Sequence, residues 1–100
     1  MTAIFTAASN TISKEARLKF GGIGGTQVAW QATASSGLAI QLTAIVVRTG
    51  ASTQIAYGSS AGYSAPTQTL ANNIDVVAIG LTSASAGDLT FKALLVEALN

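Results

Sequence analysis

Apolar and polar residues alternate with a period of two along much of the chain, a pattern typical of strands that have one buried face. In residues 16–20, three apolar side chains share one face and two basic side chains share the other. A short helix beginning at Ser13 is the alternative there, because Lys, Glu, Ala, Arg and Leu favour helices. Residues 2–8 fit a first strand or an arm. Further strands are predicted over residues 27–33, 38–48 and 53–57, with Ile55 inward and Gln54 outward.

Residues 74–99 hold two apolar runs, 74–82 and 89–99, joined by a small polar segment with a Gly-Asp pair. This arrangement predicts a β-hairpin. Both runs are apolar on both faces, whereas a strand wet on one side alternates apolar and polar residues. The hairpin therefore needs cover on two sides, and a second copy of the chain is one source of it. A terminal helix over 89–99 stays open, because Phe91, Leu94 and Leu95 also share a helical face.

Residues 58–69 contain no large aliphatic side chain and hold the only proline, which predicts a long exposed loop. About seven to eight short strands with frequent turns favour an all-β antiparallel β-sandwich, jelly-roll-like in architecture. One hundred residues fit a single domain, 1–100, with residues 1–10 as a strand or an arm.

Three aromatic side chains are candidate ligand contacts. Tyr63 lies in the predicted loop, where its ring is a candidate ligand contact or packs over the edge of the core, and Tyr57 ends the strand before it. Trp30 alternates with Val28 and Ala32, which favours a place in the core over a role as a sugar-stacking platform.

Only 9% of the residues are charged, against about 25% in an average domain, and the net charge is +1. A surface with so few charges is poorly protected against association, which favours a homo-oligomer. The five basic residues are too few and too dispersed to indicate a nucleic-acid site. The sequence contains no run of about 20 apolar residues, so membrane insertion is not expected. At the N-terminus, no basic segment precedes an apolar run, so a secretion signal is not expected either.

The sequence has no histidine and no cysteine, which removes the common nucleophile–base pairs and zinc sites. Asp75 and Asp88 would approach each other across the predicted hairpin, but an acid at a strand end is commonly a turn residue. Residues 21–25 hold four glycines, yet neither a dinucleotide-binding nor a Walker pattern follows. We therefore expect no enzyme activity, no catalytic residue, no metal and no cofactor.

The segment 47–58, with an Arg-Thr-Gly turn and a Thr-Gln strand, and the later segment closing in Leu95-Val96-Glu97 resemble small β-sandwich domains of tailed-bacteriophage virion proteins. The resemblance covers residues 40–99. It implies a structural protein of the virion, either a head decoration protein or a tail-fibre accessory subunit, that contacts other virion proteins. It also implies a strand over 89–99 near the axis of a homotrimer, with an interface that includes Phe91, Leu94, Val96 and Leu99. The alternative function is a carbohydrate-binding module, which would bind a host surface glycan.

Overall fold

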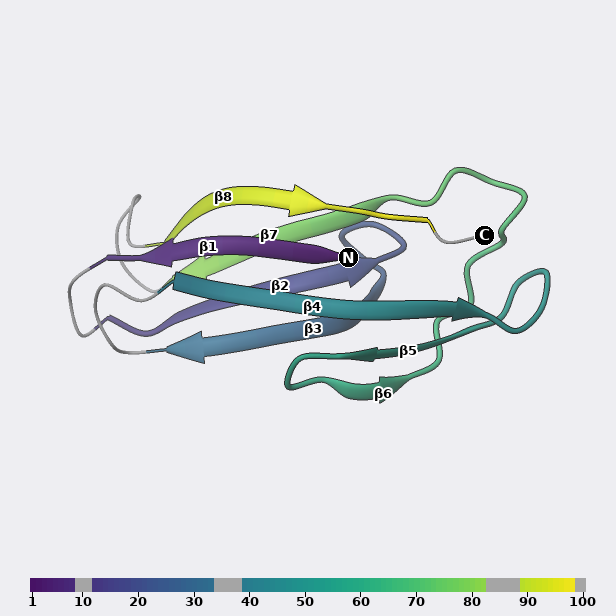
Figure 1. Cartoon of the computed structure of the whole chain (residues 1–100), viewed down its shortest axis with the longest axis horizontal. Coiled ribbons are helices and arrows are strands. Elements are labelled where there is room, and N and C mark those ends of the chain that lie inside the picture. Colours follow the sequence, from purple (N-terminus) through teal and green to yellow (C-terminus); the bar gives the residue numbers. More distant parts are fainter. Residues whose placement is uncertain (9–11, 34–38, 83–88, 99–100) are drawn as a thin grey trace.

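A computed structural model describes residues 1–8, 12–33, 39–82 and 89–98. These residues form eight strands in two antiparallel sheets that face each other (Figure 1). The strands are β1 (Thr2–Ala7), β2 (Lys14–Phe20), β3 (Thr26–Thr33), β4 (Ala39–Arg48), β5 (Gln54–Gly58), β6 (Gly62–Ser64), β7 (Val76–Thr82) and β8 (Leu89–Leu95). One sheet has the order β6-β5-β4-β1-β8 and the other the order β3-β2-β7. The predicted fold class, an antiparallel β-sandwich, is confirmed.

The core lies between the two sheets and is built from alternate residues of the long strands. Phe5, Leu18, Ile40 and Leu42 are fully or almost fully buried, and alanines fill most of the remaining inward positions. The alternation of β2 predicted from the sequence is confirmed, since its even-numbered residues are buried and its odd-numbered residues are partly exposed. Glu15, Arg17 and Lys19 thereby stay at the solvent side. Lys14 lies in the buried row, where its Nζ donates to the Ile12 carbonyl at 2.7 Å.

The first strand pairs with the last and the second with the seventh, a nested pairing that gives the sandwich its jelly-roll-like character. β1 lies between β4 and β8 in the middle of its sheet, so residues 2–7 are a strand and not an arm. β7 and β8 lie in different sheets, at the same side of the sandwich (Figure 1). The predicted hairpin over 74–99 is therefore wrong. A turn signal does not reveal whether the next strand pairs with its predecessor or crosses to the opposite sheet.

A β-bulge in β8 explains the helix-like spacing of its apolar residues. Phe5 lies opposite Phe91 and Ile4 opposite Ala93, so Lys92 is an extra residue in the ladder. The bulge reverses which residues face the core, and Phe91 and Leu94 both point to the core side although they are three positions apart. The predicted strand is confirmed over Leu89–Leu95, while residues 96–98 continue without strand structure. Residue 99 lies outside the described residues.

A second bulge moves Trp30 out of the core. Leu18 lies opposite Ala29 and Lys19 opposite Gln27, so Val28 is the extra residue of β3. Val28 and Ala29 are both fully buried, and the alternation restarts from Ala29. Trp30 consequently lies opposite Arg17, on the outer side of the three-stranded sheet, and is half-buried there. The predicted core position is wrong, because a bulge reverses the alternation on which it relied.

The predicted loop over 58–69 is strand only in part, and residues 65–69 have no strand structure. It contains β6, which pairs with β5, followed by a connecting strap over residues 65–75. The Gln54 side chain holds the strap: its amide nitrogen donates to the Gln68 carbonyl at 2.8 Å, and its oxygen accepts from the Gln68 nitrogen at 2.9 Å. Gln54 is 2% exposed and Ile55 is 39% exposed, which reverses the predicted orientation of β5. A buried amide is stable there because the strap satisfies both of its polar atoms.

Candidate interaction surface

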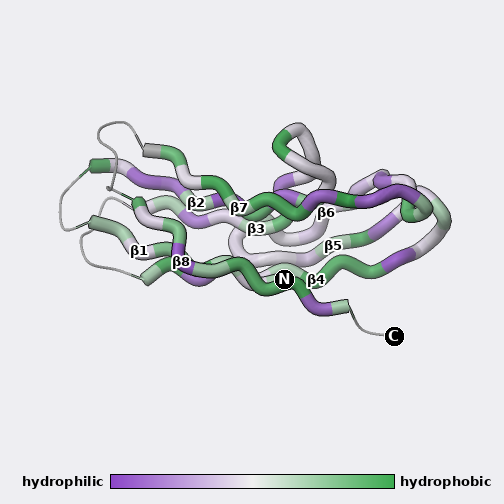
Figure 2. Tube along the Cα trace, turned by 90° about the horizontal axis from the view of Figure 1, so that it is seen from above, coloured by the Kyte–Doolittle hydropathy of each residue, from purple (hydrophilic) through white to green (hydrophobic). Residues whose placement is uncertain are grey.

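The outer face of the five-stranded sheet carries a cluster of exposed apolar side chains on β4, β5 and β6. Its members, named the tyrosine patch, are Ile45, Val47, Ile55, Tyr57 and Tyr63. They are neighbours through strand register: Ile45 lies opposite Tyr57, Val47 opposite Ile55, and Tyr57 opposite Tyr63. Figure 2 shows the hydrophobic colour of the second half of β4, the half that carries Ile45 and Val47. Ile45, Tyr57 and Tyr63 are 71%, 70% and 68% exposed, so this sheet presents apolar surface to water.

The tyrosine patch is hollowed. A half-open depression of about 170 Å³ is lined by the five patch side chains and by Ala56, and its walls are almost entirely apolar. A cavity of about 150 Å³ is large enough for benzene. The depression therefore has room for one large apolar group. A sugar would find the two tyrosine hydroxyls there, but the lining includes no charged, carboxamide, serine or threonine side chain.

The outward positions of β1 and of the first half of β4 carry no charged side chain. Thr2 lies opposite Thr43, Ile4 opposite Gln41 and Thr6 opposite Ala39, all on the outward side. Thr43 is tied to the β5–β6 turn, since its backbone nitrogen donates to the Ser59 hydroxyl at 3.0 Å. The tyrosine patch thus continues into a belt of uncharged hydrogen-bonding groups. Apolar centre and polar border are the usual arrangement of a protein–protein interface.

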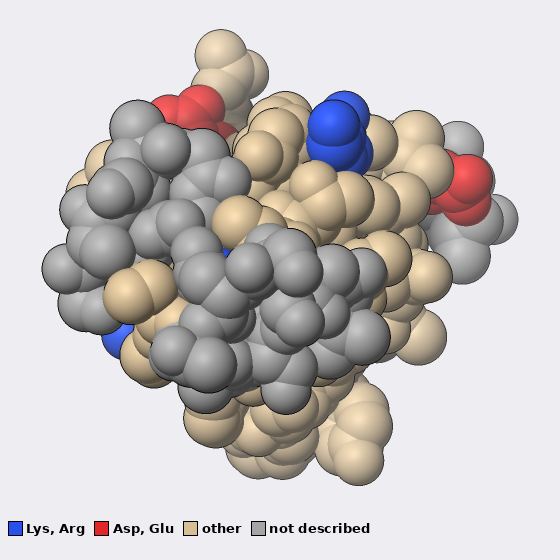
Figure 3. Space-filling model, turned by 90° about the vertical axis from the view of Figure 1, so that its left-hand side faces the viewer, with Lys and Arg blue, Asp and Glu red and all other residues tan. Residues whose placement is uncertain are grey.

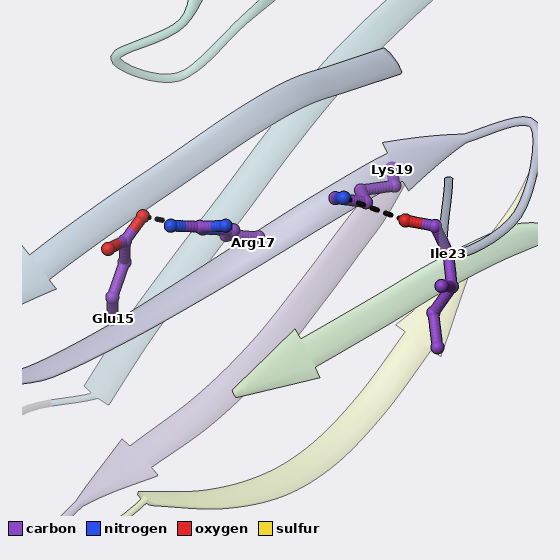
Figure 4. A network of polar contacts seen from close by, with 4 residues as sticks. All are labelled: Glu15, Arg17, Lys19 and Ile23. Carbon is purple, nitrogen blue, oxygen red and sulfur yellow. Dashed lines mark hydrogen bonds and ion pairs between the residues drawn. The ribbon is translucent and has the colours of Figure 1, made fainter. Parts of the chain in front are cut away.

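Charged side chains gather on the opposite sheet. The outward row of β2 consists of Glu15, Arg17 and Lys19 (Figure 4). The Arg17 Nε donates to the Glu15 carboxylate at 2.7 Å, and the Lys19 Nζ donates to the Ile23 carbonyl at 2.7 Å. The hydrogen bond to Glu15 raises the pKa of Arg17 above its ordinary value. Trp30 shares this face, and its backbone nitrogen donates to the Ser59 carbonyl at 3.0 Å, so β3 lies beside the β5–β6 turn.

The residues predicted for a trimer interface differ in how exposed they are. Phe91 and Val96 are 51% and 55% exposed, at the β8 edge and just beyond it. The Phe91 ring packs edge-on against Phe5 with 5.6 Å between ring centroids, so one side of it belongs to the core. Leu94 is partly buried against the core, and a charge there would disturb the fold itself. Val96 is the cleaner probe of a contact at this edge, while Leu99 lies outside the described residues.

Backbone amides of the glycine-rich segment are engaged within the fold. The backbone nitrogens of Gly21 and Gly22 both donate to the Asp75 carbonyl at 2.9 Å, so these two amides are already occupied and do not face a phosphate. Asp88, the second acid of the predicted pair, lies outside the described residues. Within the described part of the chain, no three His, Cys, Asp or Glu side chains cluster as metal ligands. Its secondary structure also includes no helix that could span a membrane.

Figure 3 looks onto one end of the molecule, where the charged side chains in view are separate spots in a mainly uncharged surface. The low charge content of the sequence is thus visible in the folded chain.

Sequence reasoning found Tyr57 and Tyr63 but not the aliphatic part of the patch. The signal was present in 38–48, where the outward positions change from Gln41 and Thr43 to Ile45 and Val47.

Comparisons with known proteins give no relative for this chain: no family model, no curated protein and no solved structure matches it.

Proposed function

We propose that this chain is a non-enzymatic structural protein that assembles with copies of itself at the surface of a bacteriophage particle. The observation that carries the assembly is the tyrosine patch, whose apolar side chains occupy positions where a sheet exposed to water is normally polar. Within the proposal, the patch and the exposed β8 edge are the surfaces through which copies and other virion proteins make contact.

The low charge of the chain supports the same proposal. A net charge of +1 with 9% charged residues provides little electrostatic repulsion between copies. Three of the six charged residues on the strands lie on the outward row of β2, away from the patch, while Arg48 ends β4 next to Val47. One sheet is thus suited to contact with protein and the other to contact with water.

The place on a phage particle is supported by the sequence resemblance of residues 40–99 to small virion β-sandwich domains. The resemblance implies a homotrimer with β8 near its axis, and Phe91 and Val96 supply exposed apolar surface for it. The two parts of the proposal need separate tests, because a chain can assemble without being part of a virion.

Light scattering coupled to size exclusion tests the assembly. We expect a stable mass of at least two copies at micromolar concentration, and a single-copy mass up to about 100 μM would overturn the proposal. Mass spectrometry of phage particles purified from cells that carry the gene tests the placement. The chain should be present at many copies per particle, and its absence from intact particles would refute the virion assignment.

The second candidate function is carbohydrate binding, and the exposed Tyr57–Tyr63 pair favours it. Aromatic rings at 70% and 68% exposure can stack on the apolar face of a sugar. A glycan array with the wild-type chain and a Tyr57→Ala variant tests this function. Binding that is lost in the variant supports it, and an array without hits rejects it. Trp30 fluorescence is an unsuitable readout, because Trp30 lies on the other sheet.

A further inference from the structure

We infer that the tyrosine patch is a contact between two copies of this chain, packed sheet to sheet about a two-fold axis. The inference rests on the self-assembly part of the proposed function and names the surface, the occupant and the symmetry, with a two-fold contact in place of the three-fold axis that the resemblance implies. A second copy is the occupant for three reasons, which concern the area of the patch, its lack of charge and its shape.

The area of the patch fits a two-copy interface. From the exposed fractions, with about 200 Å² for a tyrosine and about 100 Å² for an aliphatic side chain, the five residues expose about 430 Å² of side-chain area per copy. Two facing patches would bury about 860 Å². A standard interface buries about 1,600 Å² in total, of which about 60% is apolar. The patch therefore supplies close to the apolar share of one such interface, and the polar belt around it supplies the rest.

The charge pattern selects a copy over a charged partner. Tyrosine patch residues carry no formal charge at neutral pH, and neither do Thr43 and Gln41, the next outward residues of β4; the charged neighbour is Arg48, exposed where β4 ends. A two-fold axis brings each residue of a face near the same face of the partner, so any charge would meet its own sign. An uncharged face avoids this repulsion, whereas it has nothing to pair with an acidic or a basic partner.

The shape of the patch provides interlocking. The depression of about 170 Å³ has room for one large side chain, and the tyrosines at its rim, Tyr57 and Tyr63, project as the most exposed aromatic groups of the patch. In a two-fold arrangement, a projecting side chain of each copy enters the depression of the other. Sheets that pack face to face interdigitate in this way at a separation of about 10 Å.

Two similarly exposed isoleucines provide a matched test. Ile45 is 71% exposed in the centre of the patch, and Ile23 is 72% exposed at the tip of the β2–β3 turn. In solution, the wild-type chain should have a mass that is an even number of copies. Ile45→Asp should weaken the two-copy contact by at least about 100-fold, because two unpaired carboxylates would be buried close together. Ile23→Asp should leave the mass unchanged, and both variants should keep the wild-type circular dichroism and melting temperature of the separated chain.

Chemical cross-linking gives a readout that does not depend on a destabilising charge. The sequence has no cysteine, so Tyr57→Cys and Ile23→Cys each introduce a single thiol. A short bismaleimide should join two Tyr57→Cys chains and leave Ile23→Cys chains single.

The outcomes separate the inference from the proposed function. If Ile45→Asp keeps the wild-type mass while Val96→Asp lowers it, the copies meet at the β8 edge and the inference is wrong, although assembly stands. An odd-numbered mass, such as a trimer, with no cross-link at Tyr57→Cys also overturns the inference alone. A single-copy wild-type mass at all concentrations overturns both.

Discussion

Leu94 and Leu95 are adjacent leucines whose truncation should have very different effects. The bulge in β8 places Leu94 opposite Ala3, where it packs against the core, and leaves Leu95 opposite Thr2 with 58% of its surface exposed. A buried Leu→Ala change lowers the free energy of unfolding by about 2–5 kcal/mol. Since Leu94 is only partly buried, we expect a loss of about 2 kcal/mol for Leu94→Ala and less than about 1 kcal/mol for Leu95→Ala.

Urea unfolding measures both losses. With a slope near 1.5 kcal/mol/M, the midpoint should fall by about 1.3 M for Leu94→Ala and by less than about 0.6 M for Leu95→Ala. Unfolding is followed at two protein concentrations, so that any contribution from assembly appears as a concentration dependence and is separated from the intrinsic stability. Equal losses in the two variants would refute the placement of the bulge, because a helical face would bury both leucines together.

Other variants test the strap and a close backbone approach. Gln54→Ala should lower the free energy of unfolding by about 1–3 kcal/mol, because the strap loses both partners of its backbone, whereas the exposed Gln41→Ala should change it by less than about 0.5 kcal/mol. Gly58→Ala should lower the free energy of unfolding by more than about 2 kcal/mol in thermal unfolding, because an added Cβ would overlap the Val28 carbonyl at the bulge of β3. Gly24→Ala is the control: its Cβ meets no atom within 4 Å, so this change should be neutral or slightly stabilising. A neutral Gly58→Ala would show that β3 and β5 are not in contact as described.

The fold class could be predicted because period-two patterns survive in most strands. β2 shows it most plainly, with buried and partly exposed residues in strict alternation. The errors arose where one extra residue shifts the pattern. Val28 in β3 and Lys92 in β8 are such residues, and they account for the position of Trp30 and for the apparent helix over 89–99. A bulge has no strong signature in a single sequence, so an alternation is reliable only up to the first one.

The pairing of strands could not be predicted from local signals. A turn over 83–88 is compatible with a hairpin or with a crossing to the other sheet, and β7 and β8 take the second course. The candidate surface could be predicted in part, because the change from polar to apolar residues on the outward side of 38–48 is visible in the sequence. That these apolar residues lie next to Tyr57 and Tyr63 follows only from the register of β4, β5 and β6, which the structure provides.

The nested pairing of the strands also sets the order in which this protein folds. Thr2 lies opposite Leu95, so the β1–β8 pair at the edge of the five-stranded sheet joins residues 93 positions apart in the chain. Contacts between such distant residues close large loops and slow the search for the native state, which places all-β chains of this kind in the range of milliseconds to seconds. On the ribosome, β1 can pair with β4 well before β8 has been synthesised, and until then one edge of β1 stays open to strands of other molecules. Slow synthesis of residues 76–95 should therefore expose the nascent chain to aggregation, and a chaperone that shields β1 should raise the yield of folded protein.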